Sequence, residues 1–392
     1  MSDAFDFPFG MDPEALRDAP LFRELQRVMA AGGGPVNWEL ARQVGVASAV
    51  EAGGDPDPTD EDRRILDEAV RVAELHVARF TGLEPPSDVA VARAVRRAEW
   101  VGANIESMRA MLEPAAARMG QALERAMNEQ VPEGAAGMGS VLSQLGPLLQ
   151  GSQIGQVLGA LAQHVLGQYD VAVPRAGKGE LLFVVPNLRA FERDWSLDPV
   201  ELRTYVALHE VTHRFEFARP WARERFVQLV DDFLTTLVID VEAIQQRFAS
   251  LDPADPEALQ NALGGSDDEA LFGAILDDEQ RLKLGRVQSF MAAAEGYGDH
   301  VMRALGGELL GSFGKIEEAM RRRHDGQPAD PVFERLLGIE MKREQYDKGD
   351  AFCSTVVELT DEATLARMWD SPESLPALVE LDEPRLWLAR TV

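Results

Sequence analysis

The feature that most constrains this chain is the pentapeptide His209-Glu210-Val211-Thr212-His213, which has the pattern H-E-x-x-H in a sequence with only six histidines. On an α-helix, residues four apart lie on the same face, so the two imidazoles can hold one metal ion. Zinc accepts neutral histidine nitrogens, and the glutamate can take a proton from a zinc-bound water. The motif therefore predicts a helix with His209 and His213 as Zn²⁺ ligands and Glu210 as the catalytic base.

Flanking residues predict where this helix begins and ends. Asp198 suits the N-cap, Pro199 the first helical position, and Glu201 the partner position of a capping box. Pro220 ends or bends the helix because proline lacks a backbone N–H and restricts the residue before it. We therefore expect a helix over about residues 200–217 that carries the whole motif.

A catalytic zinc site commonly has three protein ligands and one open position. The continuation x-x-G-x-x-H is excluded as a source of the third ligand, because Glu216 and Arg219 occupy the two defining positions. Glu295 and Asp299 form an E-x-x-x-D pair on one face of a second predicted helix. We expect Glu295 to bind the metal and Asp299 to accept a hydrogen bond from a ligand histidine. His300 is the alternative ligand.

Glycines at two places predict close approach between helices. Residues 134–169 contain no charged side chain, and Gly151, Gly155 and Gly159 recur every four residues within them. Small residues at this spacing let another backbone approach, so we expect a largely buried helix, with the His209 helix as its neighbour. Gly296 and Gly298 predict a similar crossing between the Glu295 helix and the His209 helix.

Helical patterns dominate the sequence, and they extend over residues 88–100. Residues 181–185 (Leu-Leu-Phe-Val-Val) are the clearest strand, and Pro186 predicts that it lies at a sheet edge or terminus, where a peptide could pair with it. The expected fold is mainly α with a small β-sheet (α+β). We expect a disordered lead-in at 1–20, an N-terminal helical region at 21–133 and a metal-binding catalytic region at 134–392, with a flexible insertion near 251–269.

Bulk properties exclude several functions. The net charge of −27 leaves no basic footprint for nucleic acid and disfavours anionic membranes. No apolar run reaches the length of a membrane span, so no stable membrane insertion is expected. The single cysteine, Cys353, sits in a segment typical of buried packing and cannot form a disulfide within the chain. Together with an N-terminus unlike a secretory signal, this predicts a cytoplasmic protein.

The combination of H-E-x-x-H and E-x-x-x-D resembles the gluzincin branch of zinc metallopeptidases. More specifically, the chain resembles a zincin-like family of hydrolases common in actinobacteria, whose members are sometimes labelled as associated with coenzyme F420 biosynthesis. The matching segments span most of the chain: residues 34–38, 151–170, 182–187, 209–213 and 295–297. The resemblance implies a mostly helical fold, with a zincin-like metallopeptidase core and added helices, and names no substrate. Four residues are candidates for stabilising the transition state: Tyr169, Tyr297, His300 and Tyr346.

The sequence therefore predicts a zinc-dependent hydrolase, most simply a metallopeptidase that cleaves peptide bonds with a metal-activated water and Glu210 as general base. The expected cofactor is Zn²⁺, and the expected partner is a peptide or small amide substrate. Two alternatives remain: a zinc hydrolase of a non-peptide amide or small metabolite, and a non-catalytic helical scaffold that binds zinc. A fourth protein ligand in place of water would favour the scaffold.

Overall fold

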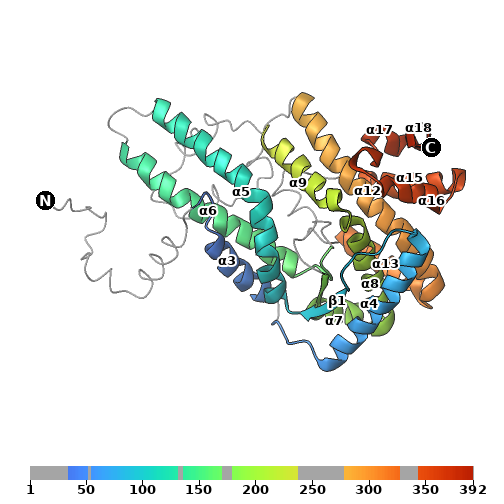
Figure 1. Cartoon of the computed structure of the whole chain (residues 1–392). Helices are drawn as coiled ribbons and strands as arrows, with labels where there is room; N and C mark the ends of the chain where they lie inside the picture. Colours follow the sequence, from blue (N-terminus) through green and yellow to red (C-terminus); the bar gives the residue numbers. More distant parts are fainter. Residues whose placement is uncertain are drawn as a thin grey trace.

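A computed structural model of the 392-residue chain describes residues 34–51, 54–130, 136–169, 179–236, 278–326 and 343–391 (Figure 1). The expected lead-in at 1–20 and the expected insertion near 251–269 lie outside these ranges. In chain order, the elements are α3 (Trp38–Glu51), α4 (Asp60–Thr81), β1 (Val91–Val95), α5 (Arg97–Gln130), α6 (Ala136–Ala162), β2 (Glu180–Val184), α7 (Val185–Asp194), α8 (Pro199–Phe217), α9 (Pro220–Leu234), α12 (Asp278–Leu309), α13 (Phe313–Gly326), α15 (Arg343–Leu359), α16 (Glu362–Ala366), η1 (Arg367–Trp369), η2 (Pro372–Ser374), α17 (Leu378–Asp382) and α18 (Pro384–Thr391).

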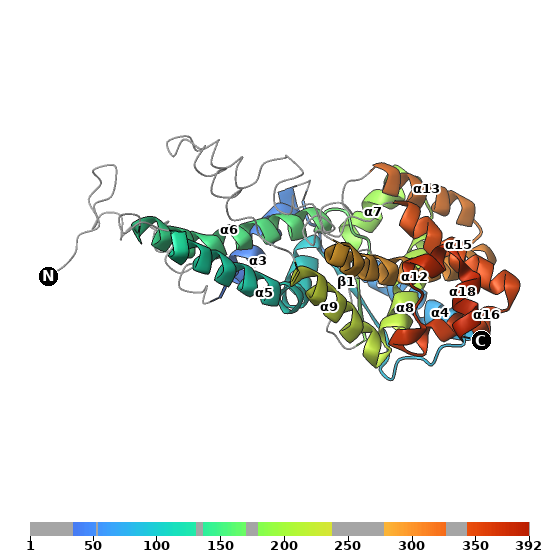
Figure 2. The same ribbon diagram turned by 90° about the horizontal axis from the view of Figure 1, so that it is seen from above.

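The helices form a lobe and an arm. Figures 1 and 2 show α3, α5 and α6 side by side in an arm that projects from the lobe containing α4, α8, α12 and α15. Within the lobe, α8 packs against α4 and α12, and α12 packs against α15. The mainly helical fold with a small sheet, predicted from the sequence, is confirmed.

The described sheet has two parallel strands, paired from Val91 opposite Glu180 to Val95 opposite Val184. The prediction of β2 is confirmed within one residue at each end. The prediction of helix over 88–100 is wrong, because residues 91–95 form β1 and α5 begins only at Arg97. The segment Val-Ala-Arg-Ala-Val alternates in burial, and its partner β2 is distant in sequence, so tertiary pairing rather than local pattern decides its structure.

β2 is an end strand of the described sheet, as predicted, but its outer side is partly covered. Opposite β1, Phe183 forms an antiparallel bridge with Gly167, and Val184 N donates to Leu166 O at 2.9 Å. We call residues 166–169 the bridging segment. Pro186 lies beyond the strand, in the first turn of α7, where its missing N–H is not needed. A peptide therefore has no free edge of β2 at Phe183.

The glycine-rich helix α6 packs against α3 and α5, so the prediction that its neighbour is the His209 helix is wrong. A Cβ on Gly155 would lie 2.5 Å from the carbonyl oxygen of Ala41 on α3. Gly159 is equally tight against α3, and Gly151 against Asn37, the residue before that helix. The bridging segment, which follows α6, contacts α8 at Glu210. None of the described helices has the length and hydropathy to cross a membrane.

The two glycines of α12 face different helices. Gly296 abuts the backbone of Gly349 on α15, and a Cβ there would collide with it. Gly298 instead faces His213 on α8, and a Cβ there would lie 3.3 Å from ring atom Cε1. The expected crossing against α8 is therefore found at Gly298 only. Cys353, also on α15, is fully buried as expected, and burial raises the pKa of its thiol.

A buried ionic network ties α4 to α7 and α8. Arg203 contacts Asp62 at 3.0 Å and Glu192 at 2.6 Å, and Arg189 also binds Asp62. Burial alone would raise the pKa of Asp62, but hydrogen bonds from Thr59 and Arg189 lower it to about 2. Each buried charge is thus paired, as burial requires, and α8 is anchored near its N-terminus.

Candidate metal centre

Helix α8 carries the H-E-x-x-H motif and begins and ends at the predicted residues. The side chain of Asp198 accepts hydrogen bonds from the backbone N–H groups of Val200 and Glu201, at 2.9 and 3.0 Å. Pro199 opens the helix and Pro220 opens the next one. The expected capping box is wrong, because the carboxylate of Glu201 instead accepts from the backbone N–H of Ser312 at 2.8 Å.

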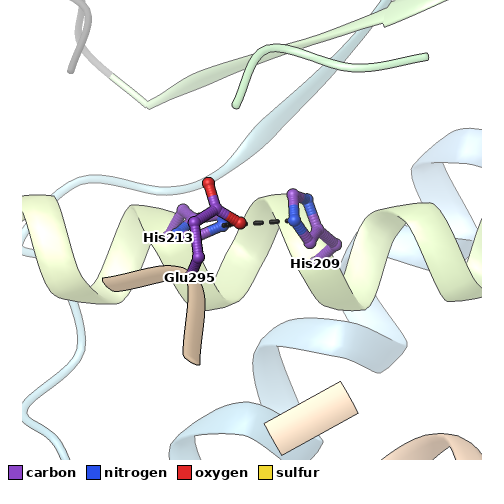
Figure 3. Close-up of side chains that lie close together, drawn as sticks. All are labelled: His209, His213 and Glu295. Carbon is purple, nitrogen blue, oxygen red and sulfur yellow. Dashed lines mark hydrogen bonds and ion pairs between the residues drawn. The ribbon is translucent and has the colours of Figure 1, made fainter. Parts of the chain in front are cut away.

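His209 and His213 direct the same ring nitrogen toward each other. Their Nε2 atoms are 3.2 Å apart, and the rings meet edge to face with centroids 4.5 Å apart (Figure 3). His213 is fully buried, whereas the side chain of His209 is 19% exposed. The spacing of four on one helix is sufficient to bring the two nitrogens together.

Glu295, on α12, completes a cluster of three potential ligands (Figure 3). Its Oε2 lies 3.9 Å from Nε2 of His213, and the three ligand atoms lie within 4.8 Å of one another. Ligand atoms around a tetrahedral zinc are roughly 3.3–3.6 Å apart, because zinc bonds to nitrogen and oxygen are about 2.0–2.2 Å long. The donor set and its spacing therefore fit zinc after small movements of the side chains.

The electrostatics of His213 also suit a metal ligand. Burial lowers the pKa of His213 well below its ordinary value, and the adjacent His209 lowers it further. A neutral imidazole keeps a lone pair on one nitrogen, which is the form that binds a metal.

Glu216 is a residue of this centre that the sequence analysis missed. Its Oε2 lies 2.7 Å from Nδ1 of His213, and both side chains are fully buried. Burial raises the pKa of Glu216 well above its usual value, and the nearby Glu295 adds to this effect. The signal was available, since Glu216 follows His213 by three residues on the same helix.

Glu210, the predicted base, is held by the bridging segment. Its Oε2 accepts hydrogen bonds from the backbone N–H groups of Gln168 and Tyr169, at 2.9 and 2.8 Å. Its Oε1 lies 3.6 Å from Nδ1 of His209. The carboxylate is fully buried, and a Cβ at Gly167 would collide with it. Glycine is thus required where the bridging segment crosses Glu210.

Comparison with known families agrees with this geometry. Residues 36–388 match the family model of zincin-like metallopeptidases. The chain belongs to that family. Membership indicates a hydrolase that uses a metal, usually zinc. No curated protein matches the chain.

A solved structure is similar over nearly the whole length. It is the crystal structure of a "putative hydrolase with a novel fold" from Chloroflexus aurantiacus, which is 32% identical in sequence with a TM-score of 0.63. The match covers 91% of this chain and 98% of that protein. This zincin-like chain and the Chloroflexus protein therefore share one fold over most of their length.

Two of the predicted transition-state residues lie near the cluster. The ring of Tyr169 lies 5.8 Å from that of His213 and stacks on Phe217 at 5.6 Å. Tyr297 is buried and packs edge-on against Trp369. Burial raises the pKa of its hydroxyl group, and the nearby Glu216 raises it further. Of the two, Tyr169 is the one in ring contact with a candidate ligand.

The remaining candidates are placed differently. His300 directs Nε2 to Glu362 at 3.0 Å and is not a member of the cluster, so it does not take the place of Glu295. Asp299 is exposed on α12 one turn after Glu295, and its hydrogen bond to a ligand histidine stays a prediction. Nδ1 of His213 is bonded to Glu216, which leaves His209 as the histidine Asp299 could serve. Tyr346 belongs to α15, and its side chain lies outside the described residues.

Proposed function

We propose that the protein is a zinc-dependent metallopeptidase in which His209, His213 and Glu295 hold the metal and Glu210 is the general base. The observation that carries this proposal is the convergence of three ligand atoms from α8 and α12 within 4.8 Å. Zinc, when bound at such a site, acidifies a water molecule and polarises a carbonyl oxygen.

In this proposal, Glu210 accepts a proton from the attacking water and returns it to the leaving amine. Its two oxygens have different tasks. Oε2 is held by the N–H groups of Gln168 and Tyr169, which fixes the side chain. Oε1 lies on the side of His209, at 3.6 Å from its ring, and we assign the proton transfer to it.

Tyr169 is our choice for stabilising the oxyanion that forms at the scissile carbonyl. Its ring lies 5.8 Å from that of His213, and its backbone is fixed by Glu210. A donor held in place before the reaction stabilises developing charge without reorganising. Replacing Tyr169 by phenylalanine keeps the stacking on Phe217 and removes only the hydroxyl, so hydrolysis should fall while zinc binding stays unchanged.

The proposal is tested with zinc-loaded protein and a library of fluorescence-quenched peptides. Wild type should hydrolyse members of the library, and Glu210→Gln should bind zinc equally well and lose hydrolysis by about 10²-fold or more. Hydrolysis that survives in Glu210→Gln would reject Glu210 as base. Wild-type protein with stoichiometric zinc and no activity on any amide would reject the enzymatic proposal.

One observation favours the alternative of a small amide substrate. Glu210 and His213 are fully buried, and the side chains of His209 and Glu295 are only 19% exposed. β2 also has no free edge at Phe183 for a peptide. Amino-acid anilides and acylated amines should therefore be assayed beside the peptides, and turnover of these alone would select the small-amide enzyme.

The zinc scaffold is less well supported. Within the described ranges the cluster has three members and no fourth His, Cys, Asp or Glu, which fits a site that keeps a position for water. A peptide or small amide as substrate, no nucleic acid partner and a cytoplasmic location remain predictions from the sequence.

A further inference from the structure

Glu216 is a buried acid with an unusual environment. Its side chain is fully buried, and burying a carboxyl group is unfavourable unless polar groups compensate it. Among the described residues its one hydrogen bond is to Nδ1 of His213, at 2.7 Å, and its Oε1 has no hydrogen-bond partner.

Other buried acids in the described part of the chain have clear partners: Glu210 is held by two backbone N–H groups, and the rest are held by arginine. Glu192 binds Arg203 at 2.6 Å, and Glu380 binds Arg390 at 2.6 Å. These pairs connect helices and need no further explanation. Glu216 contacts no arginine or lysine in the described part of the chain; it contacts a histidine that belongs to the candidate metal centre.

The 2.7 Å contact at Nδ1 is compatible with either tautomer of His213. When Nδ1–H donates to the carboxyl oxygen, the ring proton is on Nδ1 and the lone pair that can bind a metal is on Nε2. Nε2 is the atom that faces His209 at 3.2 Å and Glu295 at 3.9 Å. The same bond fixes the ring orientation.

We infer that Glu216 is a positioning residue that holds His213 as the Nδ1–H tautomer and directs its Nε2 into the cluster with His209 and Glu295. The inference rests on the proposed function, because it assigns Glu216 a role in zinc affinity. It adds a second glutamate of α8 to the site, beside Glu210.

Two measurements on three variants test it. Zinc affinity is measured by competition with a chelator of known affinity, and the tautomer of His213 is read from the ¹⁵N spectrum of metal-free protein labelled at histidine. Glu216→Leu should bind zinc about 10- to 100-fold more weakly, and its His213 should lose the Nδ1–H signature. Glu216→Gln keeps an acceptor oxygen and the side-chain shape. Its zinc affinity should therefore lie between those of Glu216→Leu and wild type, and its His213 should still favour the Nδ1–H tautomer.

Glu192→Gln is the matched control, since it changes a buried acid that is bound to Arg203 and not to the metal centre. It should leave zinc affinity and the tautomer unchanged even if it lowers thermal stability. Wild-type affinity in both Glu216 variants, with wild type itself binding tightly, would overturn the inference alone. A wild-type protein that binds no zinc would overturn the proposed function and the inference with it. If Glu216→Leu does not fold, Glu216→Gln alone tests the inference: reduced zinc affinity supports it, and wild-type affinity overturns it.

Discussion

Removing the carboxylate of Glu210 should loosen the bridging segment, whatever its effect on catalysis. In Glu210→Ala, the buried N–H groups of Gln168 and Tyr169 lose their acceptor. Each buried N–H left without a partner costs about 1–3 kcal/mol, or about 2–6 kcal/mol for the pair. Water that enters the vacated space recovers part of this, so we expect a loss of about 2–4 kcal/mol in local stability.

Amide hydrogen exchange measures this loss directly. A decrease of 2–4 kcal/mol in the free energy of local opening should speed exchange at Gln168 and Tyr169 by a factor on the order of 10–1,000. Glu210→Gln should exchange almost as slowly as wild type, because its carbonyl oxygen can still accept from both N–H groups. The N–H of Val91, which donates to Gly179 O at 2.7 Å, is an internal reference that neither variant should alter.

The pair of variants separates two roles of Glu210. If alanine loosens the segment while glutamine does not, and both abolish hydrolysis, then the charge serves the reaction and the acceptor oxygen serves the structure. Equal exchange at Gln168 and Tyr169 in wild type and Glu210→Ala would refute the reasoning, since the two hydrogen bonds would then contribute no measurable stability.

Three further predictions follow from the packing and the ionic network. A methyl group at Gly298 would lie 3.3 Å from the ring of His213, so Gly298→Ala should weaken zinc binding several-fold. Gly307→Ala is the control on the same helix, because a methyl group there would meet nothing within 4 Å. Its zinc affinity, measured by competition with a chelator, should equal that of wild type. In α6, Gly155→Ala should lower the free energy of unfolding by about 1–3 kcal/mol, because the added methyl group overpacks against α3. Gly146→Ala, where the methyl group would enter open space, should leave it unchanged. Thermal denaturation of the two variants measures the difference. The pKa of Asp62 is lowered from 3.8 to about 2, so its contribution to stability is complete above pH ~4 and is lost as the pH falls toward 2. The difference in melting temperature between wild type and Asp62→Asn should therefore be largest near neutral pH and shrink below pH ~4; a constant difference would contradict this assignment.

Local patterns were sufficient for the part of the site that lies on one helix. The spacing of four places His209 and His213 on one face, and Asp198 and Pro220 mark the limits of α8. Glu216 could have been found in the same way, because three residues after His213 is also the same face.

Contacts between distant segments were harder to predict. Glu295 was selected because a zinc site needs a third ligand, and α12 brings it to the histidines. The anchoring of Glu210 had no signal in the sequence, because its partners are backbone N–H groups that any residue offers. Gly167 is the one trace of that contact, since only glycine fits there.

The same limit explains the errors in the fold. Residues 91–95 are a strand because β2 lies beside them, and the helical reading ignored that partner. The glycines of α6 correctly indicated a close neighbour but could not identify it as α3, since small residues permit approach by any backbone.

The claim on which the account depends is that His209, His213 and Glu295 bind one zinc ion and leave a position for solvent. Anomalous diffraction at the zinc edge from crystals of zinc-loaded protein tests it most directly. We predict a single peak about 2.0–2.2 Å from both Nε2 atoms and from a carboxylate oxygen of Glu295, with no fourth protein ligand. A peak elsewhere, or one at the histidines with Glu295 turned away, would contradict the claim.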